Sequence, residues 1–326
     1  MDNSSNKCNK MIEPVVLVHG GAGNIPTTRV QEKIDGVTKA AKIGYKRLLS
    51  GGSVIDAVEA AVNFMEDDIA FNAGYGSIVN LDGQVEMDAS IMDGKNLQSG
   101  CLGALKDIKN PISLARLVME KTPHCLLVGE GATKFAKSQN VPILPPGTLV
   151  TPVALEALEK WKKKGGIANT EIGPDQNPGS VGTVGAVAVD RYGHVAVATS
   201  TGGINGKMVG RVGDTAIIGA GSYADDNIGA VSTTGHGDTI IKYCLAHAII
   251  KSMEKGLSAQ DSTTKNIDTM TERLKNTAGA ITISNKGEVG IGFSSARMAW
   301  AYQKKNELHY GIEHDQHCKE LIEEEC

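Results

Sequence analysis

Thr183 stands where a polar, Gly/Pro-rich stretch meets a predicted strand, and its hydroxyl is a candidate nucleophile. A threonine hydroxyl reacts poorly unless a base lies beside it. Cutting the chain between Gly182 and Thr183 would create a free α-amine with an ordinary pKa of about 7.7–8.0, and that amine is a built-in base. Taken alone, Gly-Thr-Val-Gly is more often an ordinary way to begin a strand, because short motifs match by chance.

The elements that must position this threonine are predicted from apolar periodicity and turn residues. Residues 183–190 and 195–201 alternate around an Asp-Arg-Tyr-Gly turn, which predicts a β-hairpin. An apolar strand, 14–18, ends in the glycine-rich segment 19–23. Ser53 and Asp56 form a capping-box pattern that opens a helix. The remaining predicted elements are helices over 29–49, 112–120, 128–138, 154–164, 239–252 and 258–275, strands over 85–94, 217–221 and 229–232, and a hairpin of 280–283 with 289–293.

This order of strands and helices predicts sheets covered by helices on their outer faces. Residues 165–182 read as a flexible linker, and the boundary at its end is covalent rather than a domain boundary, because neither side looks self-sufficient. We expect one structural domain. The charged C-terminal segment, 303–326, is expected to be a disordered tail.

Composition narrows the function. The 326 residues carry a net charge of −4 and 4% aromatic residues, which disfavours a nucleic-acid surface. The hydrophilic N-terminus does not resemble a signal peptide, and no apolar run is long enough to span a membrane. The six cysteines form no C-x-x-C pair, so free thiols in the cytoplasm are expected.

Several glycine- and threonine-rich segments together resemble the plant-type (type III) asparaginase/isoaspartyl peptidase family of N-terminal nucleophile hydrolases. The resemblance spans roughly residues 14–300. It rests on seven ordered motifs: His19-Gly-Gly-Ala-Gly, Phe71-Asn-Ala-Gly, Met87-Asp-Ala-Ser-Ile-Met-Asp-Gly, Gly182-Thr-Val-Gly-Ala-Val-Ala, Ala198-Thr-Ser-Thr-Gly-Gly, Gly210-Arg-Val-Gly-Asp and Ser232-Thr-Thr-Gly-His-Gly.

The resemblance implies a four-layer αββα sandwich. It also implies self-cleavage between Gly182 and Thr183, which would yield an α chain, 1–182, and a β chain, 183–326. Two such αβ units are expected to assemble. The implied substrates are small molecules, with neither nucleic acid nor membrane as a partner.

The matched positions carry implied roles. Thr183 would supply the nucleophile and the base, Thr201 would orient it, and Thr234 with the backbone of Gly235 would form an oxyanion hole. Asn72 matches an asparagine near the nucleophile. Singly, these residues read as ordinary strand-end and turn residues.

Substrate recognition is implied by a second group. Arg211 would bind the α-carboxylate of a β-aspartyl substrate, Asp214 would bind its α-ammonium, and Gly237 would make a backbone contact. Read without this context, Arg211 and Asp214 are a surface ion pair. Asp238 stands where the family more often has glutamate, and we expect the shorter side chain to have a small effect.

No organic cofactor is expected, but the resemblance implies a structural sodium ion. Residues 65–75 match a loop whose backbone carbonyls ligate sodium. The matching positions are Met65, Glu66, Asp68, Phe71, Ala73 and Tyr75.

The reaction implied is hydrolysis of the β-amide of L-asparagine and of β-aspartyl dipeptides. Two alternatives remain open. One is a glycosylasparaginase-like amidase, and the other is an unprocessed, non-catalytic binding protein of the same fold. The preference between asparagine and isoaspartyl dipeptides is set by the width of the folded pocket, which residue types do not give.

Overall fold

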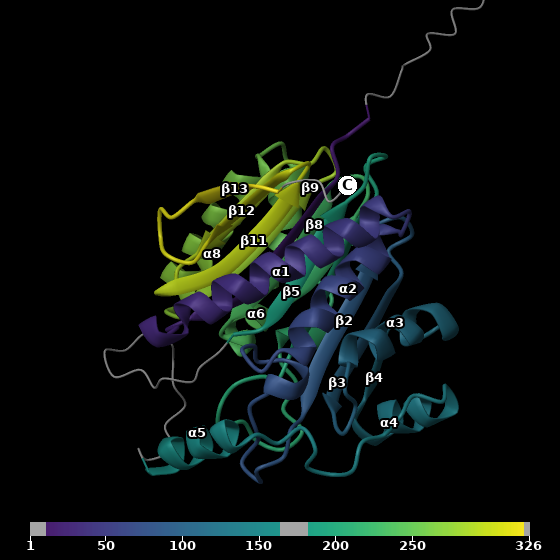
Figure 1. Cartoon of the computed structure of the whole chain (residues 1–326), viewed down its shortest axis with the longest axis vertical. Coiled ribbons are helices and arrows are strands. Elements are labelled where there is room, and N and C mark those ends of the chain that lie inside the picture. The colour runs from purple at the N-terminus through teal and green to yellow at the C-terminus, as the bar shows by residue number, and fades with distance from the viewer. Residues whose placement is uncertain (1–10, 164–181, 323–326) are drawn as a thin grey trace, which may run out of the picture.

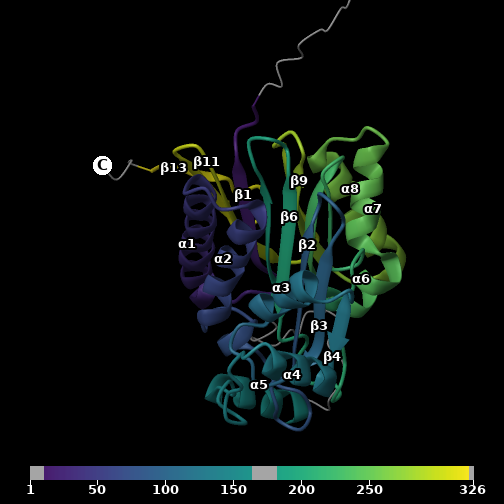
Figure 2. The ribbon, with the colours of Figure 1, turned by 90° about the vertical axis from the view of Figure 1, so that its right-hand side faces the viewer.

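Two β-sheets lie face to face, and helices cover the outer face of each (Figure 2). The computed structural model describes residues 11–163 and 182–322. Within these residues, nine strands form the larger sheet. In spatial order they are β13 (Cys318–Leu321), β12 (Glu307–Gly311), β11 (Arg297–Lys304), β1 (Val15–Gly23), β5 (Val184–Val189), β6 (Val195–Thr201), β2 (Met87–Asp93), β3 (Ser99–Leu105) and β4 (Leu126–Val128).

The smaller sheet has the order β10-β9-β8-β7 in the described chain. Its strands are β10 (Val289–Phe293), β9 (Ala278–Ser284), β8 (Gly229–Gly235) and β7 (Ser222–Asp225). The pairings are antiparallel except between β3 and β4, which are parallel. The linker predicted over 165–182 lies outside the described residues, apart from Gly182.

One set of helices covers the larger sheet and a second set covers the smaller one (Figures 1 and 2). The first set is α1 (Val30–Leu49), α2 (Val54–Asp67) and α3 (Pro111–Lys121); the second is α6 (Gly237–Tyr243), α7 (Leu245–Glu254) and α8 (Ala259–Leu274). Two further helices, α4 (Gly129–Ser138) and α5 (Pro152–Lys163), lie near the β4 end, and short 3-10 turns cover Thr27–Arg29, Gly74–Gly76 and Asp214–Ala216. None of the helices in the described ranges is long and apolar enough to cross a membrane.

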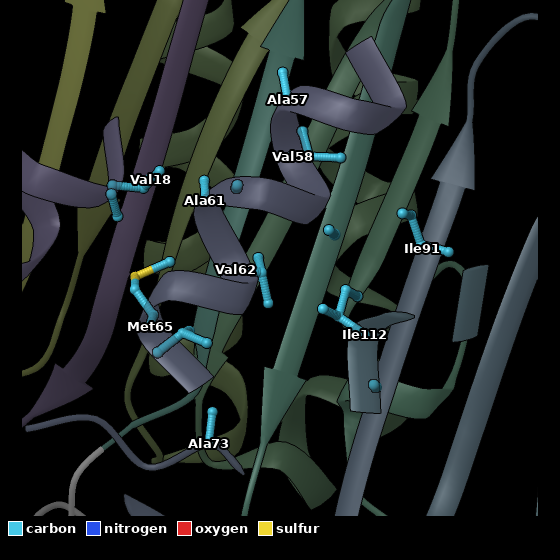
Figure 3. Packing of buried hydrophobic residues seen from close by; sticks show 14 of the residues in the cluster. Val18, Ala57, Val58, Ala61, Val62, Met65, Ala73, Ile91 and Ile112 are labelled. Atoms are coloured by element: carbon cyan, nitrogen blue, oxygen red, sulfur yellow. The ribbon is translucent and has the colours of Figure 1, made fainter. Parts of the chain in front are cut away.

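Separate apolar cores fill the three spaces between these layers. Small residues of α2, such as Ala61 and Val62, pack on the larger sheet near Val18 (Figure 3). Leu17 and Ile281 belong to the core between the two sheets. A third core joins the smaller sheet to α7 and α8. This layering confirms the predicted αββα sandwich.

Most of the predicted elements are present, including the capping box of Ser53 and Asp56 at the start of α2. The helix predicted over 239–252 is wrong as a single helix, because Cys244 adopts a left-handed conformation, φ 55°, and separates α6 from α7. The predicted strand 217–221 is also wrong, since it is reduced to one bridge between Ile218 and Ser222.

The tail predicted over 303–326 is the largest error. The chain through Leu321 forms the end of β11 and two further strands, β12 and β13, which extend the larger sheet (Figure 1). Lys305, with φ 56°, makes the tight turn between β11 and β12. Leu308 and Ile312 are fully or almost fully buried, so apolar burial holds this charged segment in place.

Candidate active site

Thr183 and Thr201 face each other across two central strands. The antiparallel register pairs Val184 with Ser200, which places these two threonines at the adjoining ends of β5 and β6. The Thr183 hydroxyl donates to Thr201 Oγ1 over 3.0 Å, and both side chains are buried. Thr201 Oγ1 also accepts from the Gly203 amide at 3.0 Å. Thr201 therefore fixes the direction of the candidate nucleophile.

The glycine-rich end of β1 packs directly against the peptide that precedes Thr183. A Cβ added to Gly21 would lie 2.6 Å from the Gly182 carbonyl oxygen. One added to Gly182 would lie 2.7 Å from both Thr234 Oγ1 and the Ala22 amide nitrogen. Glycine is required at both positions because no side chain fits there. The glycines at the end of β1 therefore allow the two backbone segments to pack closely.

Thr234 lies beside this peptide with its hydroxyl hydrogen free to point at a carbonyl. The Ala22 amide donates to Thr234 Oγ1 over 3.1 Å, and the side chain is fully buried. Gly235 follows with φ +129°, a conformation that glycine adopts at little cost. The Ala22 amide occupies one lone pair of Thr234 Oγ1, which leaves the hydroxyl one donor, the O–H, that can serve an oxyanion.

Arg211, Asp214 and Gly237 converge on one point. A Cβ added to Gly237 would lie 2.5 Å from Asp214 Oδ1 and 2.9 Å from Arg211 Nη2. Asp214 is buried and accepts from the Thr233 hydroxyl at 3.2 Å. Among the described residues, Arg211 forms its ion pair with Asp238, at 2.8 Å, and not with Asp214. A cation and a buried carboxylate on either side of a glycine suit an α-amino acid group.

Asp238 has a larger place in the site than its sequence position indicated. Its carboxylate accepts a hydrogen bond from the guanidinium of Arg211 directly. Burial would raise the pKa of Asp238, but the hydrogen bond and charge of Arg211 outweigh burial, and the pKa is lowered. Asp238 therefore stays ionised and orients Arg211.

Burial raises the pKa of Asp214 to about 6, although the charge of Arg211 and the Thr233 hydroxyl oppose the rise. Burial also lowers the pKa of His19 to about 3. His19 is therefore a neutral imidazole, with Nε2 2.8 Å from the Ser232 hydroxyl. It serves as a structural link between β1 and β8.

Asn72 contacts the site through Gly203 and not through Thr183 itself. Its side-chain amide donates to the Gly203 carbonyl at 2.8 Å, and its carbonyl oxygen accepts from the Ile78 amide at 3.0 Å. The Gly202 amide donates to the Asn72 backbone carbonyl at 2.9 Å. Asn72 thus holds the turn whose Gly203 amide positions Thr201.

In the loop after α2, backbone carbonyls pack closely against Gly74 and Gly76. A Cβ added to Gly74 would lie 2.2 Å from the Glu66 carbonyl oxygen, and one added to Gly76 would lie 2.9 Å from that of Ile69 and still closer to that of Phe71. Carbonyls at a helix C-terminus lack intrahelical partners, and α2 ends here at Asp67. Such oxygens suit a hard cation. No group of three acidic, histidine or cysteine side chains in the described chain offers a metal site.

Several supporting residues were not singled out from the sequence. Asp88 accepts from the Gly213 amide at 2.8 Å, and Lys207 donates to the Gly202 carbonyl at 2.7 Å. Burial lowers the pKa of Lys207 to about 8. Asp88 lies in the quoted Met87-Asp-Ala-Ser motif, so that motif was the available signal. Ala22 likewise lies in the quoted His19-Gly-Gly-Ala-Gly motif, whereas the buried Lys33 of α1 left no comparable signal in the sequence.

Comparison with known proteins shows which family this chain resembles. The family described as Asparaginase matches residues 12–312. The isoaspartyl peptidase/L-asparaginase of Danio rerio is 47% identical to this chain, covering 95% of it and 99% of the relative. Proteins of the same name from Homo sapiens and Rattus norvegicus are 48% and 50% identical, covering 93% and 92% of this chain and 97% and 89% of their own lengths. The similarity includes every element that carries the site.

Proposed function

Because the chain belongs to the asparaginase family, we propose that it is an N-terminal nucleophile hydrolase that releases L-aspartate from L-asparagine and β-aspartyl dipeptides. One observation carries the proposal. The Thr183 hydroxyl is held by Thr201 at 3.0 Å, next to a Gly182 peptide packed against Thr234. Arg211 and Asp214 supply complementary charges for the α-carboxylate and α-ammonium of the substrate.

Self-cleavage comes first. The Thr183 oxygen attacks the Gly182 carbonyl carbon, the C–N bond breaks, and the Thr183 nitrogen gains a proton, which converts the amide to an ester. Water then hydrolyses this ester, leaving a carboxylate on Gly182 and a free hydroxyl and amine on Thr183. The products are an α chain, 1–182, and a β chain, 183–326, within one structural domain. Thr234 stabilises the oxyanion in the first step.

Turnover uses the same oxygen. The Thr183 amine takes the hydroxyl proton as the oxygen attacks the β-carbonyl carbon of the substrate. The oxyanion lies between the Thr234 hydroxyl and the Gly235 amide. Collapse transfers the proton to the leaving ammonia or amine and forms a β-aspartyl ester. Water, deprotonated by the same amine, cleaves the ester and restores Thr183.

Thr183→Ala tests both roles together. We expect the wild-type chain to give two fragments in intact-mass spectra and to hydrolyse a β-aspartyl dipeptide. The variant should remain full-length and inactive, because alanine has no nucleophile. A full-length wild-type chain that binds L-aspartate in calorimetry without turnover would support the non-catalytic alternative. Faster hydrolysis of glycosylasparagine than of the dipeptide would favour the glycosylasparaginase-like alternative.

Three further features belong to this proposal. The backbone carbonyls of Met65, Glu66, Asp68, Phe71, Ala73 and Tyr75 would hold a sodium ion, and the ion would stiffen the loop around Asn72. A lower thermal midpoint in tetramethylammonium chloride than in sodium chloride would support this.

Two αβ units assemble. The protein acts in the cytoplasm, which agrees with the free thiols of Cys101, Cys125, Cys244 and Cys318 and is testable by cell fractionation.

A further inference from the structure

Lys33 is a fully buried lysine on the first turns of α1, outside the reacting groups described above. Its Nζ donates to the Gly20 carbonyl at 3.1 Å and lies 4.4 Å from the centre of the Phe71 ring. Burial of an amine is costly and shifts it toward the neutral form. Its pKa accordingly lies well below the ordinary value. The fold thus bears the free-energy cost of burying the Lys33 amine beside the Gly20 carbonyl.

The Gly20 carbonyl lies where β1 departs from regular pairing. The pairing of β1 with β11 is interrupted between His19 and Ala22, and the register with β5 extends to His19. Lys33 gives the carbonyl in this interruption a donor. The amine and the ammonium both carry N–H groups, so the hydrogen bond is available in either protonation state.

The same short segment reaches the peptide to be cleaved. Gly21 packs on the Gly182 carbonyl, and the next amide, that of Ala22, holds Thr234 Oγ1. On its other side Gly20 touches Phe71, since an added Cβ would lie 2.5 Å from the ring. Lys33 therefore stands where the glycine-rich end of β1 meets the loop that carries Phe71 and Asn72.

We propose that Lys33 is a positioning residue for self-cleavage: by holding the Gly20 carbonyl it fixes the segment that aligns the Gly182 carbonyl with Thr183 and Thr234. The inference rests on the proposed function. It affects the attack on Gly182 most, because that step depends on the placement of a peptide that Gly21 contacts directly. Arg211 and Asp214 lie on other elements, so Lys33 has little influence on substrate binding.

Three substitutions grade the donor. Lys33→Arg keeps a long donor, Lys33→Gln keeps a shorter one, and Lys33→Met keeps only the apolar stem. We expect the first-order rate constant for fragment formation to fall in the order Arg, Gln, Met, with about a hundredfold loss in Met, as misplacement of reacting groups by about 1 Å produces. Once matured, each variant should keep a KM for a β-aspartyl dipeptide within about twofold of wild type, because uniform binding is intact.

Tyr45→Phe is the matched control on the same helix. It removes the acceptor of the Lys305 amide, a 2.8 Å hydrogen bond at the far end of α1. We expect it to lower the thermal midpoint without slowing cleavage. If Tyr45→Phe slowed cleavage as much as Lys33→Met at equal loss of stability, Lys33 would have only a structural role.

The outcomes separate this inference from the proposed function. A wild-type chain that never cleaves overturns the proposed function. If the wild-type chain cleaves, and Lys33→Gln and Lys33→Met cleave at the wild-type rate, the inference alone is overturned. If Lys33→Met does not fold, the comparison of Arg with Gln still decides, because wild-type cleavage in Gln contradicts the proposal.

Discussion

At the scale of single residues, the candidate site holds some polar atoms in place before any substrate arrives. The Ala22 amide fixes Thr234 Oγ1, and in the proposed reaction the O–H of Thr234 donates to the oxyanion. Arg211 has Nη2 fixed by Asp238, so the guanidinium is already oriented when a carboxylate arrives. Preorganised groups of this kind avoid the cost of reorientation during the reaction. The proposed reactivity of Thr183 therefore depends on its neighbours as much as on its own hydroxyl.

Asp214 should give the enzyme an acid limb near pH 6. Burial raises its pKa to about 6, and only the ionised carboxylate pairs with the substrate ammonium. As pH falls through 6 the carboxylate gains a proton, so kcat/KM for a β-aspartyl dipeptide should fall. Because kcat/KM reports the free enzyme, kcat should show this limb less.

The variant Asp214→Asn should lose the limb near pH 6 and keep one near the amine pKa of Thr183, ordinarily about 7.7–8.0. Asp268→Asn on the exposed side of α8 is the control and should keep both limbs. Persistence of the limb near pH 6 in Asp214→Asn would contradict the assignment.

At the scale of elements, the C-terminal strands illustrate what sequence reasoning weighs badly. The charged composition of 303–326 favoured disorder. In the fold, however, Lys304 lies opposite Glu307 in the antiparallel register of β11 and β12, next to a tight turn. Tyr302 stacks on His309, with 4.4 Å between ring centres. Long-range pairing of β11 with β1 makes this hairpin possible, and local composition does not contain that partner.

Ending the chain after Lys304 should destabilise the protein strongly. The truncation removes β12 and β13 and the buried Leu308 and Ile312, each worth about 1.5–3 kcal/mol of burial. Urea unfolding in a Thr183→Ala background, which keeps the chain in one piece, measures the loss. A Thr183→Ala chain that ends after Ile322 is the control and should unfold at the same midpoint as the full-length Thr183→Ala chain. Equal midpoints for both truncations would mean that these strands contribute nothing to stability.

Glu66, near the end of α2, should make stability fall with rising pH. Burial raises its pKa to about 8, against hydrogen bonds from Ser200 and Ile112, compared with an ordinary 4.5. Between these values the folded protein keeps a proton that the unfolded chain has lost, so the free energy of unfolding decreases as pH increases.

The variant Glu66→Gln cannot ionise and should show a flatter dependence between pH 5 and about 8, measured by urea unfolding at constant sodium concentration. The control is Glu130→Gln, at an exposed pair with Lys134. A dependence as steep in Glu66→Gln as in wild type would exclude Glu66 as its source.

How far the sequence leads depends on the range of the interaction. Capping of α2, the 183–201 hairpin and the threonines of the site were predictable because they rest on local pattern or on quoted motifs. The pairing of Arg211 with Asp238 and the burial of Lys33 depend on strands and loops that meet only in the fold. Cys244 separates α6 from α7, but cysteine is not a helix-breaking residue type, so the sequence did not predict this break.

At the scale of the whole molecule, the proposed cut would leave two interleaved chains. Across the larger sheet, β1 of the first part lies between β11 and β5 of the second, and β2 of the first follows β6 of the second. Each part therefore supplies strands to the interior of the same sheet. Separation would expose several strand edges at once, so the two fragments should stay together until denaturant is added.

The β4 edge of the larger sheet is a candidate contact for the assembly of two αβ units. Strand β4 is at the border of the larger sheet, with Leu126 41% and Val128 50% exposed. Open strand edges with apolar side chains favour pairing with another chain. If a second copy covers this edge, equilibrium sedimentation should give twice the 34.2 kDa of one chain. Val128→Lys places a charge there and should shift the mass toward one unit, whereas Val153→Lys, also exposed but on α5, should not. A mass unaffected by Val128→Lys would place the contact elsewhere, and a single-unit mass for wild type would contradict the assembly itself.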